Sequence, residues 1–171
     1  EAVSVGRECL EVRQRVLGKE HPHTLNTMSI LASTLNDAGE HREAVSVGRE
    51  CLEVRQRVLG KEHPHTLATM YNLASALRNA GEHREAVSVG RECLEVRQRV
   101  LGRENPHTLD TMSNLALALL HLPDSEQEAL SIIVECRRLL PEKRDSSGAF
   151  AAACARAVHA LALSWNDQHQ E

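Results

Sequence analysis

Apolar residues recur at helical spacing along the chain, in two alternating stripes. The first stripe consists of residues three or four positions apart, Leu67, Met70, Leu73, Ala74, Leu77 and Ala80. The second stripe follows it, Ala86, Val89, Cys93, Val96 and Val100. Such spacing places each set on one face of an α-helix. The charged run from Arg49 to Arg57 predicts a solvated face of the second helix type, supported by Glu53–Arg57 pairs one turn apart.

Capping residues predict where these helices begin and end. Pro64 suits the first helical position, where its missing N–H costs nothing, so His63 is the expected N-cap. Asn105 takes that place in the following copy and is among the best N-cap residues, which supports the assignment. Gly81 is expected to end the first helix and Gly102 the second.

The whole pattern returns every 42 residues. Residues 1–42 and 43–84 differ at only six positions, and the copy that starts at Glu85 repeats the same text through Leu101. A period of this size is typical of a solenoid, in which each unit buries its apolar face against its neighbours. We therefore expect a second helix of a truncated first repeat (1–21), two repeats (22–63 and 64–105), a divergent last repeat (106–141), and a C-terminal capping helix with a polar tail (142–171).

The two ends of the array are expected to differ. An Ala-rich segment from about Ala149 to Trp165 is the predicted cap, because a terminal unit must present a wettable outer face. The chain begins inside a second helix, so we expect it to be a fragment of a longer array. The apolar face left open there could drive end-to-end self-association.

Composition narrows the classes of function. The 171 residues carry a net charge of −4 and only three aromatic residues, Tyr71, Phe150 and Trp165, which argues against nucleic-acid binding. No apolar run approaches the ~20 residues that span a bilayer, and no signal-peptide pattern opens the chain, so no membrane association is expected. Cysteines that occupy equivalent places in successive repeats should not pair, which favours a reduced, cytoplasmic protein.

Reactive residues do not converge on an enzyme site. The close pairs His21/His23 and His63/His65 raise a metal hypothesis, but residues joined by proline at a helix start do not share a helical face. Cys51 falls on the apolar stripe of its helix, so a role in core packing is a simpler interpretation of this residue than a role as a catalytic nucleophile. We expect neither metal nor cofactor, and no catalytic activity.

The repeat resembles the tetratricopeptide repeat. The positions of the family pattern are occupied here by Met70, Leu73, Ala74, Leu77, Ala86 and Gly90. The closing proline of the pattern, Pro106, comes later than in the family, so the unit has 42 residues. Residues 59–67 and Asn72-Leu73-Ala74 are similar to the arrays of kinesin light chains and of NOD-like receptors. The resemblance implies an all-α fold, a right-handed α–α superhelix of helix-turn-helix repeats. Glycine replaces a bulky residue at Gly6, Gly48 and Gly90, for which a close helix approach is one explanation.

Differences between the copies indicate where binding could occur. All six changes between the first two copies fall in the first helix, on the side opposite Leu67 and Leu73, whereas the second helix is unchanged. By resemblance, that side lines the concave groove of a tetratricopeptide array. The expected ligand-binding residues are Asn26, Ser29, Ile30, Ser33, Asn36, Asp37, Ala68, Tyr71, Asn72, Ser75, Arg78, Asn79, Asp110, Ser113, Asn114, Leu117 and His121. Random differences left by recent duplication are the alternative explanation.

Two functions follow from this pattern. The first is a non-catalytic scaffold that binds a protein or peptide on the concave face, as the ligand-sensing array of a NOD-like receptor would. The second is a structural module that stacks end to end with other copies.

Overall fold

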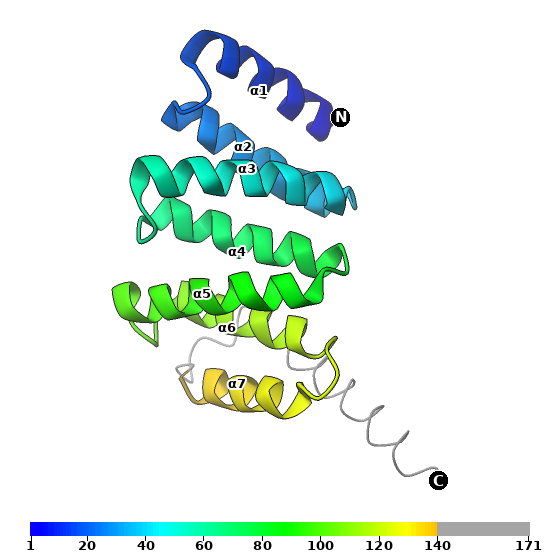
Figure 1. Ribbon diagram of the computed structural model, residues 1–171, viewed down its shortest axis with the longest axis vertical. Helices are drawn as coiled ribbons and strands as arrows, with labels where there is room; N and C mark the ends of the chain where they lie inside the picture. Colours follow the sequence, from blue (N-terminus) through cyan, green and yellow to red (C-terminus); the bar gives the residue numbers. More distant parts are fainter. Residues whose placement is uncertain (140–171) are drawn as a thin grey trace. The chain divides into compact units, whose positions relative to one another are not determined.

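The computed structural model describes residues 1–139, all of whose regular elements are α-helices (Figure 1). They are α1 (Ala2–Leu17), α2 (Pro22–Asp37), α3 (His41–Leu59), α4 (Pro64–Asn79), α5 (His83–Leu101), α6 (Pro106–Leu119) and α7 (Glu126–Leu139). The expected C-terminal cap, residues 142–171, lies outside the described part. Among the described helices, none combines the length and apolarity that crossing a bilayer requires.

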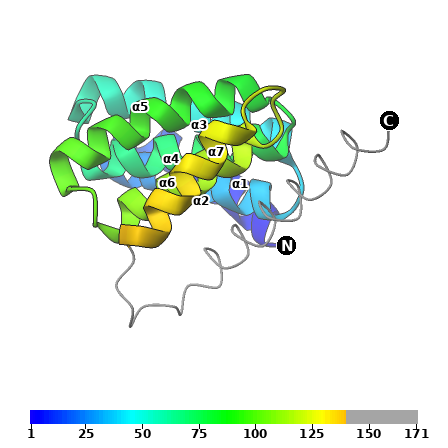
Figure 2. The same cartoon turned by 90° about the horizontal axis from the view of Figure 1, so that it is seen from below.

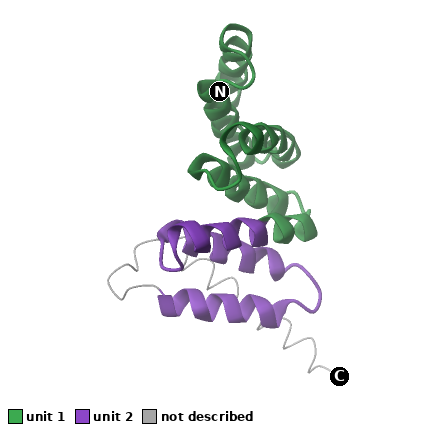
Figure 3. Ribbon diagram, turned by 60° about the vertical axis from the view of Figure 1, so that its left-hand side comes forward, with its two compact units in different colours: residues 1–89 green, residues 90–171 purple. Residues whose placement is uncertain are grey.

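The chain divides into two compact units, Glu1–Val89 and Gly90–Glu171, and the division falls inside α5 (Figure 3). In the first unit α2 packs against α1, α3 and α4, and α3 also packs against α4. Figure 2 shows α3 on one side of this stack and the first helices α2 and α4 on the other. In the second unit α6 packs against α7. The architecture is thus an all-α array of helical hairpins.

The buried stripe of the first helices is the predicted one. Leu67, Met70, Leu73, Ala74 and Leu77 of α4 are all buried. Ala80 is not part of this stripe, because α4 ends at Asn79 and Ala80 is its half-buried C-cap. In the second unit Leu109, Met112 and Cys136 form the equivalent core, with Leu94, Ile132 and Leu139 against it.

The helix ends follow the capping prediction. The Nδ1 atom of His63 accepts a hydrogen bond from the His65 N–H at 3.1 Å, and Asn105 Oδ1 accepts one from the His107 N–H at 2.9 Å. After α4, Gly81 adopts φ +83°, and the Glu82 N–H donates to the Leu77 carbonyl at 2.9 Å. A left-handed glycine with this bond is a Schellman ending.

The mid-helix glycines have a packing cause. A Cβ atom at Gly48 of α3 would stand 3.3 Å from Leu73 Cδ1 of α4, and one at Gly6 of α1 would stand 3.0 Å from Leu31 Cδ1 of α2. In the second unit, a Cβ at Gly90 would stand 3.4 Å from Leu115 Cδ1. At Gly6 and Gly48 a leucine of the first helix therefore leaves little space for a side chain, whereas at Gly90 the contact would be an ordinary one. The expectation of a close approach is confirmed.

The second-helix stripe differs from the prediction in α5. Val100 is 43 % exposed, whereas Val87 and Arg97 are buried. Ala86, Cys93 and Val96 of the predicted stripe are buried, and Arg97 is a buried polar residue one turn after Cys93 on the same face. In the second unit, Arg97 Nη1 donates to the His107 carbonyl at 2.6 Å and to Thr111 Oγ1 at 2.7 Å.

Candidate functional site

The expected binding residues of α2 and α4 lie beside, not within, the apolar stripe. Ile30 is 67 % exposed, and Asp37 and Asn79 are also exposed. Half-buried positions make up the rest of the set, Asn26, Ser29, Ser33, Asn36, Ala68, Tyr71, Asn72, Ser75 and Arg78. The two first helices also contact each other, so these side chains form one surface of the first unit, which we call the first-helix face.

Two of the changing residues bond to each other. The Asn79 amide of α4 donates to Asn36 Oδ1 of α2 at 3.0 Å, and the same oxygen lies 3.1 Å from His41 Nδ1. Asn79 also lines a shallow depression with Glu40, Glu43 and other residues around the α2–α3 turn. Residues that differ between copies therefore take part in packing between neighbouring first helices.

Two changing positions are not available on the surface. Ala76, which stands where the first copy has Thr34, is one of the six changes expected on the side away from the core, but it is 2 % exposed. Asn114, an expected binding residue of α6, is 8 % exposed. Both are buried because a first helix has neighbours on more than one side, so its solvated face is narrower than the helical spacing predicts.

The remaining expected residues lie in the second unit. Asp110 is exposed, with its carboxylate 4.0 Å from His107 Nδ1. Ser113 is half-buried, and its hydroxyl donates to the Leu109 carbonyl at 3.1 Å. Leu117 is half-buried and His121 is exposed.

The prediction of a solvated face for Arg49–Arg57 is wrong for Arg55. This side chain is 2 % exposed and lies between α2 and α4. Its Nη1 atom donates to the His65 carbonyl at 2.8 Å and to Thr69 Oγ1 at 2.6 Å. Its Nη2 atom donates to the Leu25 carbonyl at 3.2 Å and to Asn26 Oδ1 at 2.8 Å.

Helical spacing contained the signal that sequence reasoning missed. Arg55 follows Cys51 by four residues, and Cys51 was placed in the core, so both belong to one helical face. Cys51 is indeed fully buried, and burial raises the pKa of its thiol. Burial also lowers the pKa of the Arg55 guanidinium.

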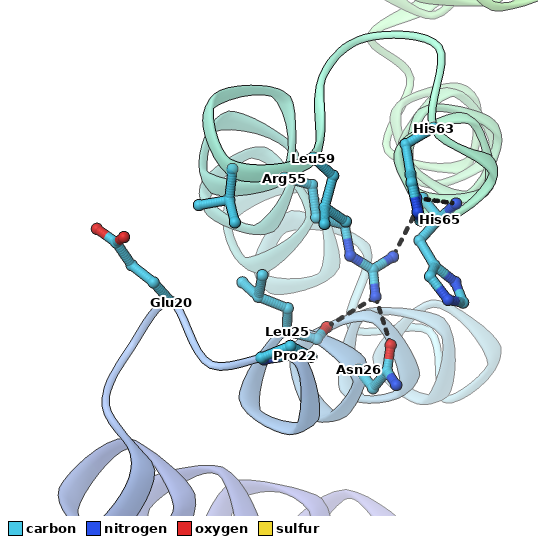
Figure 4. Close-up of a pocket in the computed structure, with 9 residues that line it drawn as sticks. Glu20, Pro22, Leu25, Asn26, Arg55, Leu59, His63 and His65 are labelled. Carbon is cyan, nitrogen blue, oxygen red and sulfur yellow. Dashed lines mark hydrogen bonds between the residues drawn. The ribbon is translucent and has the colours of Figure 1, made fainter.

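A pocket of about 250 Å³ opens beside Arg55 (Figure 4). It is lined by nine residues from the α1–α2 turn to the start of α4, namely Glu20, Pro22, Leu25, Asn26, Arg55, Val58, Leu59, His63 and His65. We call it the Arg55 pocket. The Nε atom of Arg55 is buried and has no hydrogen-bond partner. Asn26 is the expected binding residue that belongs to this pocket.

The outer face of the second helices is held by ion pairs. Arg7 of α1 bonds to Glu40 and Glu43 at 2.7 Å each, and Arg49 of α3 bonds to Glu82 at 3.0 Å and to Glu85 at 2.7 Å. Arg7 lowers the pKa of the Glu43 carboxyl, chiefly by hydrogen bonding to it. Because these charges bond to the next second helix, they have a structural role that explains their constancy between copies.

The histidines and cysteines were the remaining candidates for metal binding or catalysis. No group of three or more His, Cys, Asp or Glu side chains is arranged there to hold a metal ion. Cys9, Cys51, Cys93 and Cys136 carry free thiols, and the last three are buried. The paired histidines instead cap helices, as described for His63.

Comparisons with known proteins agree with this geometry. The tetratricopeptide repeat family model matches residues 1–56, 30–98 and 66–142, which is most of the chain. A crystal structure of nearly identical TPR-like repeats from a Podosopora anserina protein, described as a kinesin light chain, is 26 % identical, with a TM-score of 0.79. A point variant of that protein has a TM-score of 0.81 at the same identity. In both comparisons the match covers 98 % of this chain and 81 % of the other chain.

A third structure, BtubC (BKLC) from P. vanneervenii, shares the fold at 21 % identity and a TM-score of 0.71, over 98 % of this chain and 74 % of that one. No curated protein matches the chain.

Proposed function

The chain belongs to the tetratricopeptide repeat family, and from that premise we propose that it is a non-catalytic scaffold that binds a protein or peptide segment on its first-helix face. Proteins of this fold typically serve as interaction scaffolds rather than as enzymes.

The observation that carries the proposal is the contrast between the two kinds of helix. All six differences between the first two copies lie in first helices, and the second helices are unchanged. Second-helix residues such as Arg49 and Arg55 bond to neighbouring helices, so their constancy is required for packing. Most of the changing residues keep some exposed surface, for example Ile30 and Tyr71. Selection for a ligand would act on such residues.

Affinity on such a face would come from many modest contacts. The first helices are held by a packed core, so binding would require little ordering of the protein. Asn72, Arg78 and Asn79 would supply hydrogen bonds, and Ser33 and Ser75 would leave room for ligand side chains.

The finer proposal is that the array senses a ligand for a NOD-like receptor in the cytoplasm. It is supported by the similarity of residues 59–67 to such arrays. In that case the signal that a ligand has bound would be passed to a switch domain elsewhere in the receptor.

A triple substitution tests the main proposal. A peptide selected from a displayed library on the intact chain is measured by fluorescence anisotropy against Tyr71→Ala/Asn72→Ala/Asn79→Ala. We expect at least about a tenfold rise in Kd, worth about 1.4 kcal/mol, while the variant stays folded with only a small fall in melting temperature from the lost Asn36–Asn79 bond. The matched control, Ser46→Ala/Glu50→Ala/Glu53→Ala, alters exposed residues of α3 and should leave Kd unchanged. Equal loss in both variants would contradict the proposal.

A structural module that stacks end to end is the second function, and the surface of α1 favours it. Val5 and Val12 are 60 and 49 % exposed, although their counterparts Val47 and Val54 in α3 are covered in part by α2. Val16 is 68 % exposed, and its counterpart Val58 is 45 % exposed. Sedimentation velocity at rising concentration tests this. Self-association that Val12→Glu/Val16→Glu abolishes would support stacking, and a monomer at all concentrations would exclude it.

A further inference from the structure

The Arg55 pocket contains a buried cation that no carboxylate of residues 1–139 neutralises. The four hydrogen bonds of the guanidinium go to neutral oxygens, on Leu25, Asn26, His65 and Thr69. Its fifth donor, Nε, is buried without a partner. A buried donor without an acceptor costs about 1–3 kcal/mol, and a buried charge without a counter-charge costs more. An anionic acceptor beside Nε would remove both costs.

The acidic residue of the pocket does not supply this acceptor. Glu20 Oε1 bonds to Arg57 Nη2 at 2.7 Å, and both side chains are more than half exposed. Figure 4 shows the Glu20 carboxylate turned away from the guanidinium, on the far side of the pocket. Within residues 1–139 no carboxylate pairs with Arg55, so the site is open to an anion carried by another molecule.

The rest of the lining specifies what carries the anion. Pro22, Leu25, Val58 and Leu59 form apolar walls between Glu20 and Arg55. The pocket volume of about 250 Å³ lies below the usual range of about 300–1,000 Å³ for sites that bind drug-sized ligands. The pocket therefore fits one short aliphatic group. Val58 lines the pocket and is 45 % exposed, and a change of its rotamer would let a ligand oxygen approach the buried Nε atom.

We propose that the Arg55 pocket binds a carboxylate carried on a short aliphatic chain, with a carboxylate oxygen accepting a hydrogen bond from Arg55 Nε. The aliphatic part lies against Leu25, Val58 and Leu59. The carboxylate belongs either to the C-terminus of a peptide or to an acidic side chain. This site is separate from the first-helix face except for Asn26, and it does not depend on the proposed function.

Sequence differences between copies agree with a selective pocket. One repeat later, the apolar lining residues return unchanged as Pro64, Leu67, Val100 and Leu101. Two polar lining residues change, Asn26 to Ala68 and His63 to Asn105. Constant apolar walls with changing polar groups are expected where hydrogen bonding selects among related ligands.

Butyrate is the probe that tests the site. The Nε–Hε signal of Arg55 is followed by ¹H–¹⁵N NMR while butyrate is added, with sodium chloride holding ionic strength constant. We expect a saturable shift and slower hydrogen exchange at Nε, because a new acceptor protects this proton. Butyramide, the neutral analogue, should leave the signal in place. An equal response to butyramide, or none to butyrate at millimolar concentration, would overturn the proposal.

A matched pair of variants locates the effect. Val58→Phe fills the pocket and should abolish the shift, whereas Val16→Phe introduces the same ring at the equivalent place in α1, which does not line the pocket. If Val58→Phe responds as the unchanged chain does, butyrate binds elsewhere and the proposal fails. Acetyl-Leu-Leu with a free C-terminus and acetyl-Leu-Glu-amide then distinguish the two sources of the carboxylate. Loss of the shift in Val58→Phe with peptide binding to the first-helix face intact would separate the two sites.

Discussion

Arg55 of α3 donates a hydrogen bond of 2.8 Å to the side-chain oxygen of Asn26 in α2, so a residue that is identical in three copies bonds to one that differs between them. Arg55 also reaches the Thr69 hydroxyl of α4 and thereby joins helices on both of its sides. Replacement of Asn26 by Ala68 in the following copy removes the side-chain acceptor at the equivalent place. Variation on the first helices therefore changes packing as well as the surface.

Replacement of Arg55 by alanine should destabilise the array strongly. It removes the four hydrogen bonds that join α3 to α2 and α4 and leaves a cavity between these helices, and we expect a loss of about 2–4 kcal/mol in the free energy of unfolding. Arg13→Ala is the matched control, because Arg13 of α1 is only half-buried and bonds to His23 and Thr27. In urea denaturation, Arg13→Ala should lose clearly less free energy of unfolding than Arg55→Ala. Equal losses would contradict the role assigned to Arg55.

Enlarging a mid-helix glycine should change stability according to the size of the added side chain and the space beside it. At Gly90 the added Cβ would be in ordinary contact, at 3.4 Å from Leu115 Cδ1, so Gly90→Ala should stabilise by about 0.5–1 kcal/mol through helix propensity. At Gly48 the space is tighter, at 3.3 Å from Leu73 Cδ1, and Gly48→Val should destabilise by about 1–3 kcal/mol through overpacking. Thermal unfolding measures both. A stabilised Gly48→Val variant would show that the helices separate freely.

Acid should weaken the ion pair between α1 and α3. Arg7 lowers the pKa of Glu43 below its ordinary 4.5, so the pair stabilises the fold fully above that value and is lost as the pH falls through the folded-state pKa. Glu43→Gln should therefore make stability less dependent on pH below about 4.5, the usual glutamate range. Urea titrations from pH 6 to about pH 3 check this, with Glu53→Gln of α3 as the control. The effect is small because both partners are nearly half exposed.

Cysteine alkylation should distinguish the first copy from the others. Burial raises the pKa of the Cys51 and Cys93 thiols, so little thiolate forms near neutral pH and reagent access is low. Cys9 of α1 is partly exposed. We expect iodoacetamide to label Cys9 first, and Cys51 and Cys93 only on unfolding, as peptide mass mapping would record. Labelling of all three at one rate would contradict the packing of α3 and α5.

Much of the fold could be predicted because the period and the caps are local signals. Pro64, His63 and Gly81 act within a few residues of their own positions, so their roles are readable from the chain. The close approach at Gly48 was only one explanation until Leu73 was placed beside it.

The candidate site was less predictable. The spacing of Asn26, Tyr71 and Asn79 on a helix predicted a common side, and the first-helix face contains them. It did not predict that Ala76 and Asn114 would be buried, or that Asn36 and Asn79 would bond to each other, since both depend on neighbours far along the chain.

The sequence determined the helical hairpin, its 42-residue repeat and its capped ends, because hydrophobic spacing and capping act between residues close in the chain. Only the tertiary structure decided that Arg55 faces inward, since an arginine can be buried only where hydrogen-bond acceptors surround it, and here they come from α2 and α4. The same convergence produced the Arg55 pocket and left Nε without a partner. Contacts between separate helices, which no stretch of sequence displays, thus created the site.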